Sequence, residues 1–266
     1  MTTLTHTAAD SATMLRRQLR HLLRYPTLTL MVAAMPVVFL LIFVYVFGGT
    51  LGSGLGHGVL SGRAAYIAYV TPGILIFTVA SAAQGTAISV ATDMTSGIIA
   101  RFRTMAIARA SVLTGHVLGS LIQAVLSLAL LLGMAVAIGF RPAAGPLAWL
   151  AAVGLLTATA FAFTWLSVAL GLAAKTVEGA SNTPLFLLIL PFFGSGFVPT
   201  GSMPAGLRFF AEYQPFTPIT EALRGLLTGG PVASHAAAAG AWCAGIALVS
   251  YLWARRRYDQ GPQLGG

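Results

Sequence analysis

Charged residues are scarce in this sequence, and their scarcity argues against a soluble protein. Asp, Glu, Lys and Arg make up 8% of the 266 residues, whereas hydrophobic residues make up 57%. A soluble domain usually has about 25% charged residues. The apolar residues also form continuous runs, and not the alternating segments of about 10 residues that are typical of a transmembrane β-barrel. We therefore expect an all-α integral membrane protein.

Residues that carry out chemistry are also missing from the sequence. Cys243 is the single cysteine, which excludes a disulfide framework or a cysteine-based metal site within one chain. The sequence has no GxxxxGK[ST] phosphate loop, and no paired carboxylates, metal-spaced histidines or Ser/His/Asp arrangement stand out. We expect no catalytic, cofactor-binding or metal-binding residues in this chain, and no enzymatic activity of its own. The polar, basic first 25 residues do not have the pattern of a removable signal peptide.

Charges are absent from the interior of the long apolar runs. The acidic residues Asp93, Glu178, Glu212 and Glu221 all fall at loops or at the ends of runs. Ion-coupled carriers usually need titratable or ion-coordinating groups near the middle of the membrane. If this chain takes part in energised transport, we expect the energy to come from another chain.

The sequence does contain six long apolar runs. Four or five of them are long enough to cross a hydrocarbon core of about 30 Å as helices with a rise of about 1.5 Å per residue. Their approximate bounds are Leu28–Phe47, Tyr66–Ala91, Thr114–Gly139, Leu147–Leu172, Asn182–Val198 and Ala233–Trp253. Pro184 and Pro191 interrupt the fifth run, so a segment that enters the membrane only halfway stays an alternative there. We divide the chain into an N-terminal interfacial helix (1–27), a six-helix membrane domain (28–254) and a tail (255–266).

The basic residues are distributed unequally between the two sides of the membrane. If the chain crosses six times, both ends lie on one side, and eleven of the 15 basic residues lie there: Arg16, Arg17, Arg20, Arg24, Arg101, Arg103, Arg109, Lys175, Arg255, Arg256 and Arg257. The other side has Arg63, Arg141, Arg208 and Arg224. Cytoplasmic loops carry the excess of Lys and Arg, so we expect both termini to be cytoplasmic. This distribution explains the net charge of +9 without a nucleic-acid partner.

Asp10–Tyr25 has the pattern of a basic amphipathic helix. Leucines fall on one helical face, and four arginines fall on the opposite face: Arg16, Arg17, Arg20 and Arg24. Such a helix lies along the inner leaflet. The pattern leaves open whether it only anchors the chain to lipid or also contacts a cytoplasmic partner.

The cytoplasmic loop Thr92–Ser111 predicts a docking helix for a soluble subunit. Asp93, Gly97 and Arg101 are spaced by four residues and share one helical face. An apolar stripe runs along another face, at Ile98, Phe102 and Met105. The alternative is an extension of the second span, whose arginines only set the topology.

The segment Pro199–Pro231 is the longest outer loop, and it is too apolar for a solvated one. Prolines suggest two short helices, Pro204–Tyr213 and Pro218–Leu227. Arg208 can pair with Glu212, and Glu221 can pair with Arg224. We expect both helices to dip into the outer interface. A structural lid and a role at the exit of a transport path both stay open.

Two glutamines lie inside the predicted spans at a similar depth. Gln84 and Gln123 can therefore form a hydrogen bond with each other, and the alternative is that they line a substrate path. Gly115 and Gly119 form a face of small residues for close helix contact. We interpret His116 as a packing or interfacial residue.

Taken together, these segments resemble the membrane subunit of a type-2 ABC exporter, particularly the daunorubicin-resistance permease family. Three stretches carry the resemblance: "SATMLRRQLRHLLRYP", "ATDMTSGIIARFRTMAIARASVLTGHVLG" and "SGFVPTGSMPAGLRFFAEYQPFTPITEALRGLL". It covers nearly the whole chain. The chain departs from the family at Ala106, where the family often has a proline.

The resemblance implies roles for several sets of residues. Two coupling regions would contact ATP-binding subunits: Asp93, Gly97, Ile98, Arg101, Phe102, Arg103, Met105 and Arg109 in the first, and Lys175 and Glu178 in the second. The N-terminal helix with its four arginines would be the connecting helix beside the ATPase. Re-entrant elements at the exit would include Pro199, Met203, Pro204, Glu212, Gln214, Pro215, Pro218, Glu221 and Arg224.

The resemblance also implies the partners. The chain would work with a second permease copy, either identical or a close paralogue, and with two separate ATP-binding subunits that bind ATP and Mg. We therefore predict the permease subunit of an exporter in a bacterial plasma membrane, which moves an amphiphilic drug, secreted metabolite or lipid. The alternatives are an ion-coupled secondary carrier and a membrane assembly factor that transports nothing.

Overall fold

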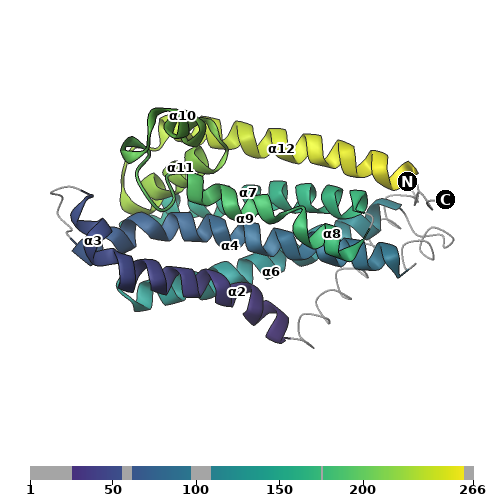
Figure 1. Cartoon of the computed structure of the whole chain (residues 1–266), viewed down its shortest axis with the longest axis horizontal. Helices are drawn as coiled ribbons and strands as arrows, with labels where there is room; N and C mark the ends of the chain where they lie inside the picture. The colour runs from purple at the N-terminus through teal and green to yellow at the C-terminus, as the bar shows by residue number, and fades with distance from the viewer. Residues whose placement is uncertain (1–25, 56–61, 97–108, 175, 261–266) are drawn as a thin grey trace.

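The computed structural model describes residues 26–55, 62–96, 109–174 and 176–260, and all regular structure in these ranges is helical (Figure 1). The long elements are α2 (Pro26–Leu41), α4 (Gly62–Thr95), α6 (Arg109–Ala137), α7 (Pro146–Ala173) and α12 (Ala233–Gln260). The π-helix η1 (Ile42–Phe47) and α3 (Gly48–Ser53) continue α2. The shorter elements are α8 (Val177–Asn182), α9 (Leu185–Ile189), η2 (Leu190–Phe193), η3 (Thr200–Ser202), α10 (Ala205–Tyr213) and α11 (Phe216–Thr228).

Five helical stretches are long and apolar enough to cross a membrane: Val32–Ser53, Gly62–Thr95, Thr114–Ala137, Pro146–Ala173 and Ala233–Tyr258. They confirm the all-α membrane class and match five of the six predicted spans. The first stretch ends six residues later than predicted, at Ser53. Its glycines allow this extension, because a Cβ on Gly52 would lie 2.0 Å from the carbonyl oxygen of Gly62 at the start of α4.

The fifth predicted span consists of short pieces. α8, α9 and η2 together run from Val177 to Phe193, which is shorter than the five long stretches. Pro184 precedes α9 and Pro191 lies in η2, and proline can neither donate a helical hydrogen bond nor fit against the preceding turn. The six-span count therefore stays a prediction.

α4 is the central helix of the bundle (Figure 1). Most of its residues are buried, whereas only a minority of the residues in the other four long stretches are. Apolar side chains such as Leu147 (80% exposed) and Val249 (66% exposed) lie on those outer helices. Lipid suits such surfaces and water does not. The two ends of the bundle are named below after α4, as the Gly62 end and the Thr95 end.

The two predicted outer helices differ in burial. α10 is exposed except at Ala211, whereas α11 packs its buried residues against α4, α7 and α12. The sequence predicted that this helix begins at Pro218, but α11 begins at Phe216. Pro218 still fits, because it lies in the first turn, where backbone N–H groups have no helical partner.

Candidate functional site

The Gly62 end contains a short stretch of irregular backbone, Gly194–Phe197, between η2 and η3. All four of its residues are buried. The N–H of Gly194 still donates to the carbonyl oxygen of Pro191 in η2 at 3.2 Å, but the groups beyond it need partners outside the regular helices, and a membrane offers them no water. Such backbone is tolerated at membrane depth only where the protein or an enclosed cavity supplies partners. The origin of these partners therefore shows which elements hold this stretch in place.

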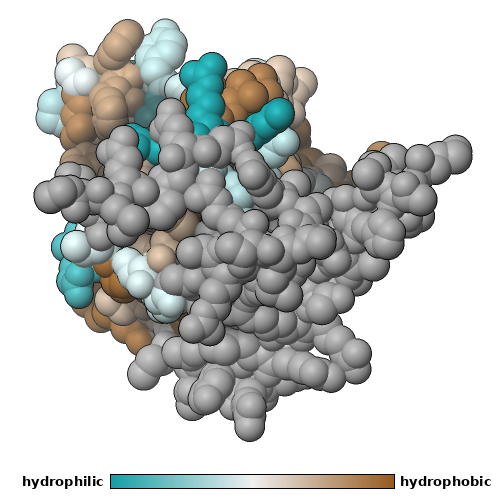
Figure 2. Space-filling view, turned by 90° about the vertical axis from the view of Figure 1, so that its right-hand side faces the viewer, coloured by the Kyte–Doolittle hydropathy of each residue, from teal (hydrophilic) through white to brown (hydrophobic). Residues whose placement is uncertain are grey.

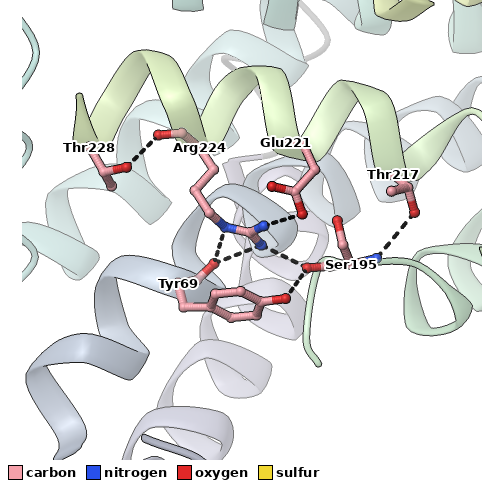
Figure 3. Close-up of polar contacts among 6 residues, drawn as sticks. All are labelled: Tyr69, Ser195, Thr217, Glu221, Arg224 and Thr228. Atoms are coloured by element: carbon pink, nitrogen blue, oxygen red, sulfur yellow. Dashed lines mark hydrogen bonds and ion pairs between the residues drawn. The ribbon is translucent and has the colours of Figure 1, made fainter. Parts of the chain in front are cut away.

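Side chains of α4 and α11 supply the partners. Tyr69 Oη donates to the carbonyl oxygen of Ser195 at 2.8 Å, and Tyr66 Oη donates to that of Phe197 at 3.1 Å. The backbone N–H of Ser195 donates to Thr217 Oγ1 at 3.2 Å. The irregular backbone is thus tied to two helices on either side of it (Figure 3).

Arg224 of α11 connects these elements. Its Nη2 donates to the carbonyl oxygens of Ser195 at 2.7 Å and of Tyr69 at 3.1 Å, and its Nε donates to Tyr69 at 3.2 Å (Figure 3). Its Nη1 forms an ion pair with Glu221 at 2.5 Å. The guanidinium carbon lies 3.8 Å from the centroid of the Tyr69 ring, within cation–π range. Tyr69 lies three residues before Pro72, whose missing N–H interrupts the hydrogen bonds of α4.

Two glycines let the irregular stretch approach its neighbours. A Cβ on Gly73 of α4 would lie 2.4 Å from the carbonyl oxygen of Gly196, so the two backbones touch. A Cβ on Gly194 would lie 2.8 Å from Gln214 Nε2, which donates to the carbonyl oxygen of Leu190 at 3.2 Å. No larger residue fits at either position unless the backbone or the amide moves.

Aromatic rings fill the space beside this stretch. Phe192 and Phe197 stack with centroids 4.4 Å apart and an interplanar angle of 7°. Phe43 of η1 lies 4.8 Å from Phe197, and Phe39 of α2 lies 5.1 Å from Phe77 of α4. The rings therefore link the first span to α4 and to the irregular stretch.

The structure brings only part of the predicted outer set together. Glu221 and Arg224 form the predicted pair, and they lie at the irregular stretch together with Gln214. Glu212 also forms its predicted pair, with Arg208 at 2.7 Å, but on the exposed helix α10. The prolines and Met203 mark element boundaries: Pro199 precedes η3, Met203 and Pro204 lie between η3 and α10, Pro215 precedes α11, and Pro218 lies in its first turn. The sequence analysis missed Tyr66, Tyr69, Ser195 and Thr217, although Tyr66 and Tyr69 share one face of α4 just before Pro72.

At the Thr95 end, a contact between a histidine and a carboxylate joins α4 to α6. His116 Nε2 lies 3.1 Å from Asp93 Oδ2, and the two side chains are 4% and 11% exposed. Asp93 was predicted on the docking loop, but it lies buried in α4, close to the end of that helix. His116 is buried, as a packing residue would be.

Most of the other predicted coupling residues lie outside the described residues: Gly97, Ile98, Arg101, Phe102, Arg103, Met105, Lys175, and the connecting-helix residues Arg16, Arg17, Arg20 and Arg24. Arg109 begins α6. Glu178 is exposed in the first turn of α8, where Thr176 caps the helix by accepting from the N–H of Gly179 at 3.0 Å. A carboxylate is favourable at such a helix N-terminus.

The two membrane glutamines do not use each other in the hydrogen bonds recorded for the described residues. Gln84 Nε2 donates to the carbonyl oxygen of Ser181 in α8 at 3.0 Å. Thr86 and Ser120 instead join α4 to α6 at this level, with their hydroxyl oxygens 2.6 Å apart. Gln123 is half-buried on α6. Within the described part of the chain, no three His, Cys, Asp or Glu side chains gather into a group that could hold a metal ion.

Comparison with known proteins places these features in a family. The chain is 29% identical over 184 residues to the daunorubicin resistance ABC transporter permease protein DrrB1 of Streptomyces coeruleorubidus, a match covering 69% of this chain and 62% of that protein. It is 32% identical over 166 residues to the probable doxorubicin resistance ABC transporter permease protein DrrC of Mycobacterium tuberculosis, covering 61% of this chain and 59% of that protein. The matches thus span about three-fifths of each relative. The family model described as ABC-2 type transporter matches residues 11–228, so the chain belongs to the ABC-2 type transporter family.

Proposed function

We propose that this chain is the membrane subunit of an ATP-driven exporter of amphiphilic compounds. The observation that carries the proposal is the family match, which covers residues 11–228. The relatives are named as permeases of daunorubicin and doxorubicin resistance. From these names and from the scarcity of charged residues inside the apolar runs, we infer an amphiphilic drug, secreted metabolite or lipid as the cargo of this chain.

The energy comes from two separate ATP-binding subunits, which hold ATP and Mg. They dock at the Thr95 end, where the termini of α4 and α6 flank residues 97–108 and where α7 is followed by α8 (Figure 1). Gly97, Ile98, Arg101, Phe102, Arg103, Met105 and Arg109 form the main contact, and Lys175 and Glu178 form the shorter one. Nucleotide binding stabilises one of two states of the membrane subunit by closing the two ATPases.

The Thr95 end faces the cytoplasm of a bacterial cell, and the Gly62 end faces outward. Arg255, Arg256 and Arg257 support this orientation, because they are exposed in the last turns of α12 at the Thr95 end. Figure 2 looks onto this end, and hydrophilic as well as hydrophobic side chains reach its visible surface. α10 then lies in the outer interface, where its exposed Phe209 and Tyr213 suit the boundary between head groups and acyl chains.

The exporter contains two membrane subunits, either identical or closely related. The fifth apolar segment, Val177–Phe193, is shorter than the five long stretches, so a path enclosed by one subunit is hard to build. Two copies related by a two-fold axis provide a path at their interface, and closed two-fold assemblies are the commonest ones.

Purification and transport together test the proposal. The chain is purified from its native membrane, and we expect a stoichiometric ATPase to accompany it, with two membrane subunits per particle by mass measurement. Inside-out vesicles should accumulate doxorubicin when ATP is added, and a protonophore should not prevent this. Uptake that follows a proton gradient and needs no ATPase would instead identify a secondary carrier.

A further inference from the structure

We infer that Asp93 and His116 form a positioning pair that holds the ends of α4 and α6 together. When a partner pushes on this end, the two helices then move together and transmit the movement to the rest of the bundle. The inference rests on the proposed function, because it concerns the two helices that flank the proposed ATPase contact. It assigns Asp93 a role inside the membrane subunit, and not at the surface that the ATPase would touch.

The position of the pair fits this role. Asp93 lies two residues before Thr95, the last residue of α4, and His116 lies in the second turn of α6, which begins at Arg109. His116 Nε2 and Asp93 Oδ2 are 3.1 Å apart, within hydrogen-bonding distance. The contact therefore joins the two helices within two turns of the ends that flank residues 97–108.

The surroundings make this contact strong. Both side chains are buried, at the level of an apolar cluster that involves α4, α6, α7 and α12: Val90, Val117, Trp165, Val168, Ala169, Leu172, Ala254 and Tyr258. A carboxylate in such surroundings is costly unless it is paired and hydrogen-bonded. The apolar shell also weakens competition from water, so this contact resists separation more than the same contact would on an exposed surface.

A second polar contact joins α4 and α6 farther from the Thr95 end. We call the line of contact between these two helices, which contains both polar contacts, the seam. Thr86 of α4 and Ser120 of α6 have their hydroxyl oxygens 2.6 Å apart. Thr86 and Asp93 are seven residues apart, and His116 and Ser120 are four apart, so each helix presents both of its residues on one face. Two contacts along one seam fix both the separation and the relative tilt of two antiparallel helices.

Removing the contact between Asp93 and His116 should change how movement at the Thr95 end reaches the rest of the bundle. The deeper contact stays at Thr86, and the nine residues from there to Thr95 cover about 14 Å of helix. Over that length α4 and α6 can then separate without moving the rest of the bundle. Movement at the Thr95 end then separates the ends of the two helices, and less of that movement reaches the part of the bundle inside the membrane.

Distance measurements on the full chain test the pair directly. Spin labels are placed at Ser96→Cys and Ser111→Cys in a Cys243→Ala background, with the chain in lipid nanodiscs. We expect a narrow distance distribution for the parent, a distribution at least twice as broad for Asp93→Asn and for His116→Gln, and a return to the narrow distribution in the exchanged double variant Asp93→His/His116→Asp. A narrow distribution in both single variants, or an exchanged variant as broad as they are, would overturn the inference.

Coupling provides a readout that a purely structural role would not move. In variants that still assemble with the ATPase, we expect the amount of doxorubicin transported per ATP hydrolysed to fall at least fivefold for Asp93→Asn and to recover to within twofold in the exchanged variant. Ser81→Ala is the control on α4, because the hydrogen bond recorded for its hydroxyl group stays within that helix, and it should stay within twofold of the parent. An unchanged ratio in Asp93→Asn would show that the pair only packs. If no ATPase accompanies the parent chain, the proposed function fails, while the spin-label experiment still decides whether the pair holds the two helices.

Discussion

The two ends of α4 are fastened in different ways. At the Gly62 end, Tyr66 and Tyr69 of α4 and Arg224 of α11 bind backbone carbonyl oxygens of an irregular stretch. At the Thr95 end, the side chains of Asp93 and His116 join two regular helices. The first arrangement compensates for backbone that cannot satisfy itself, whereas the second is not needed for backbone hydrogen bonding. Polar contacts at the Gly62 end therefore hold the local fold, whereas we infer that the contact at the Thr95 end fixes the position of α4 relative to α6.

The largest effect expected is a complete difference in labelling between the two ends. Ala205→Cys, at the start of α10, should react with a membrane-impermeant maleimide added to intact cells, whereas Ser96→Cys should react only after the cells are opened. Both positions are exposed. The parent chain is the control, because its single cysteine, Cys243, is 5% exposed. The opposite labelling pattern would reverse the proposed orientation and exchange the roles of the two ends.

Arg224→Ala should cause the largest loss of stability. It removes the guanidinium donors from the carbonyl oxygens of Ser195 and Tyr69 and takes away the recorded partner of Glu221. Hydrogen bonds that involve a charged group contribute about 1.5–3 kcal/mol each, so losing several together should exceed the loss of any single neutral one. The loss can be measured by reversible unfolding in mixed SDS micelles. Arg208→Ala is a matched control, because Arg208 also pairs with a glutamate one turn away but is 53% exposed. The control should change the free energy of unfolding by less than about 0.5 kcal/mol, as surface substitutions usually do. Equal losses in the two variants would mean that the network at Ser195 does not hold the Gly62 end.

The sequence predicted the long helices well, because a run of apolar residues has few alternatives to a helix in a membrane. It also predicted both outer ion pairs from their spacing. It could not predict how deeply each outer helix is buried. α10 and α11 are both amphipathic, yet one is exposed and the other lies against three long helices. Periodicity identifies a helical face, but only the tertiary arrangement decides what covers it.

The partners of the irregular stretch were also beyond sequence reasoning. Tyr66 and Phe197 are 131 residues apart, and Arg224 and Tyr69 are 155 residues apart. No local spacing rule relates such positions. Pro72 and the glycines Gly194 and Gly196 were the available signals, because they mark places where backbone groups lose their helical partners. The side chain of Asp93 is buried, although its spacing from Gly97 and Arg101 fits a surface helix, and spacing alone could not indicate that burial.

Gly73→Ala should have an intermediate effect. The added methyl group would lie 2.4 Å from the carbonyl oxygen of Gly196, so a backbone must move, and overpacking of this kind typically costs about 1–3 kcal/mol. Gly85→Ala is the control on the same helix, since nothing lies within 4 Å of its added Cβ. That change should be neutral or should stabilise α4 by up to about 1 kcal/mol, because alanine favours helix. If both variants unfold at the same SDS fraction as the parent, α4 does not touch the irregular stretch as closely as described.

The smallest expected losses of stability are those of the Tyr→Phe variants at the two tyrosines of α4, Tyr66 and Tyr69. Tyr69→Phe removes one donor from the carbonyl oxygen of Ser195, but Arg224 Nη2 still donates to that oxygen at 2.7 Å. Its cost should therefore stay near the net value of one hydrogen bond, about 0.5–1.5 kcal/mol. Tyr66 Oη is the side-chain donor recorded for the carbonyl oxygen of Phe197. Tyr66→Phe should cost more, about 1–3 kcal/mol, because it leaves a buried carbonyl unsatisfied. Each single variant is compared with the double variant in the same micelles, and a Tyr69→Phe loss that exceeds the Tyr66→Phe loss would mean that Arg224 does not support the Ser195 carbonyl independently.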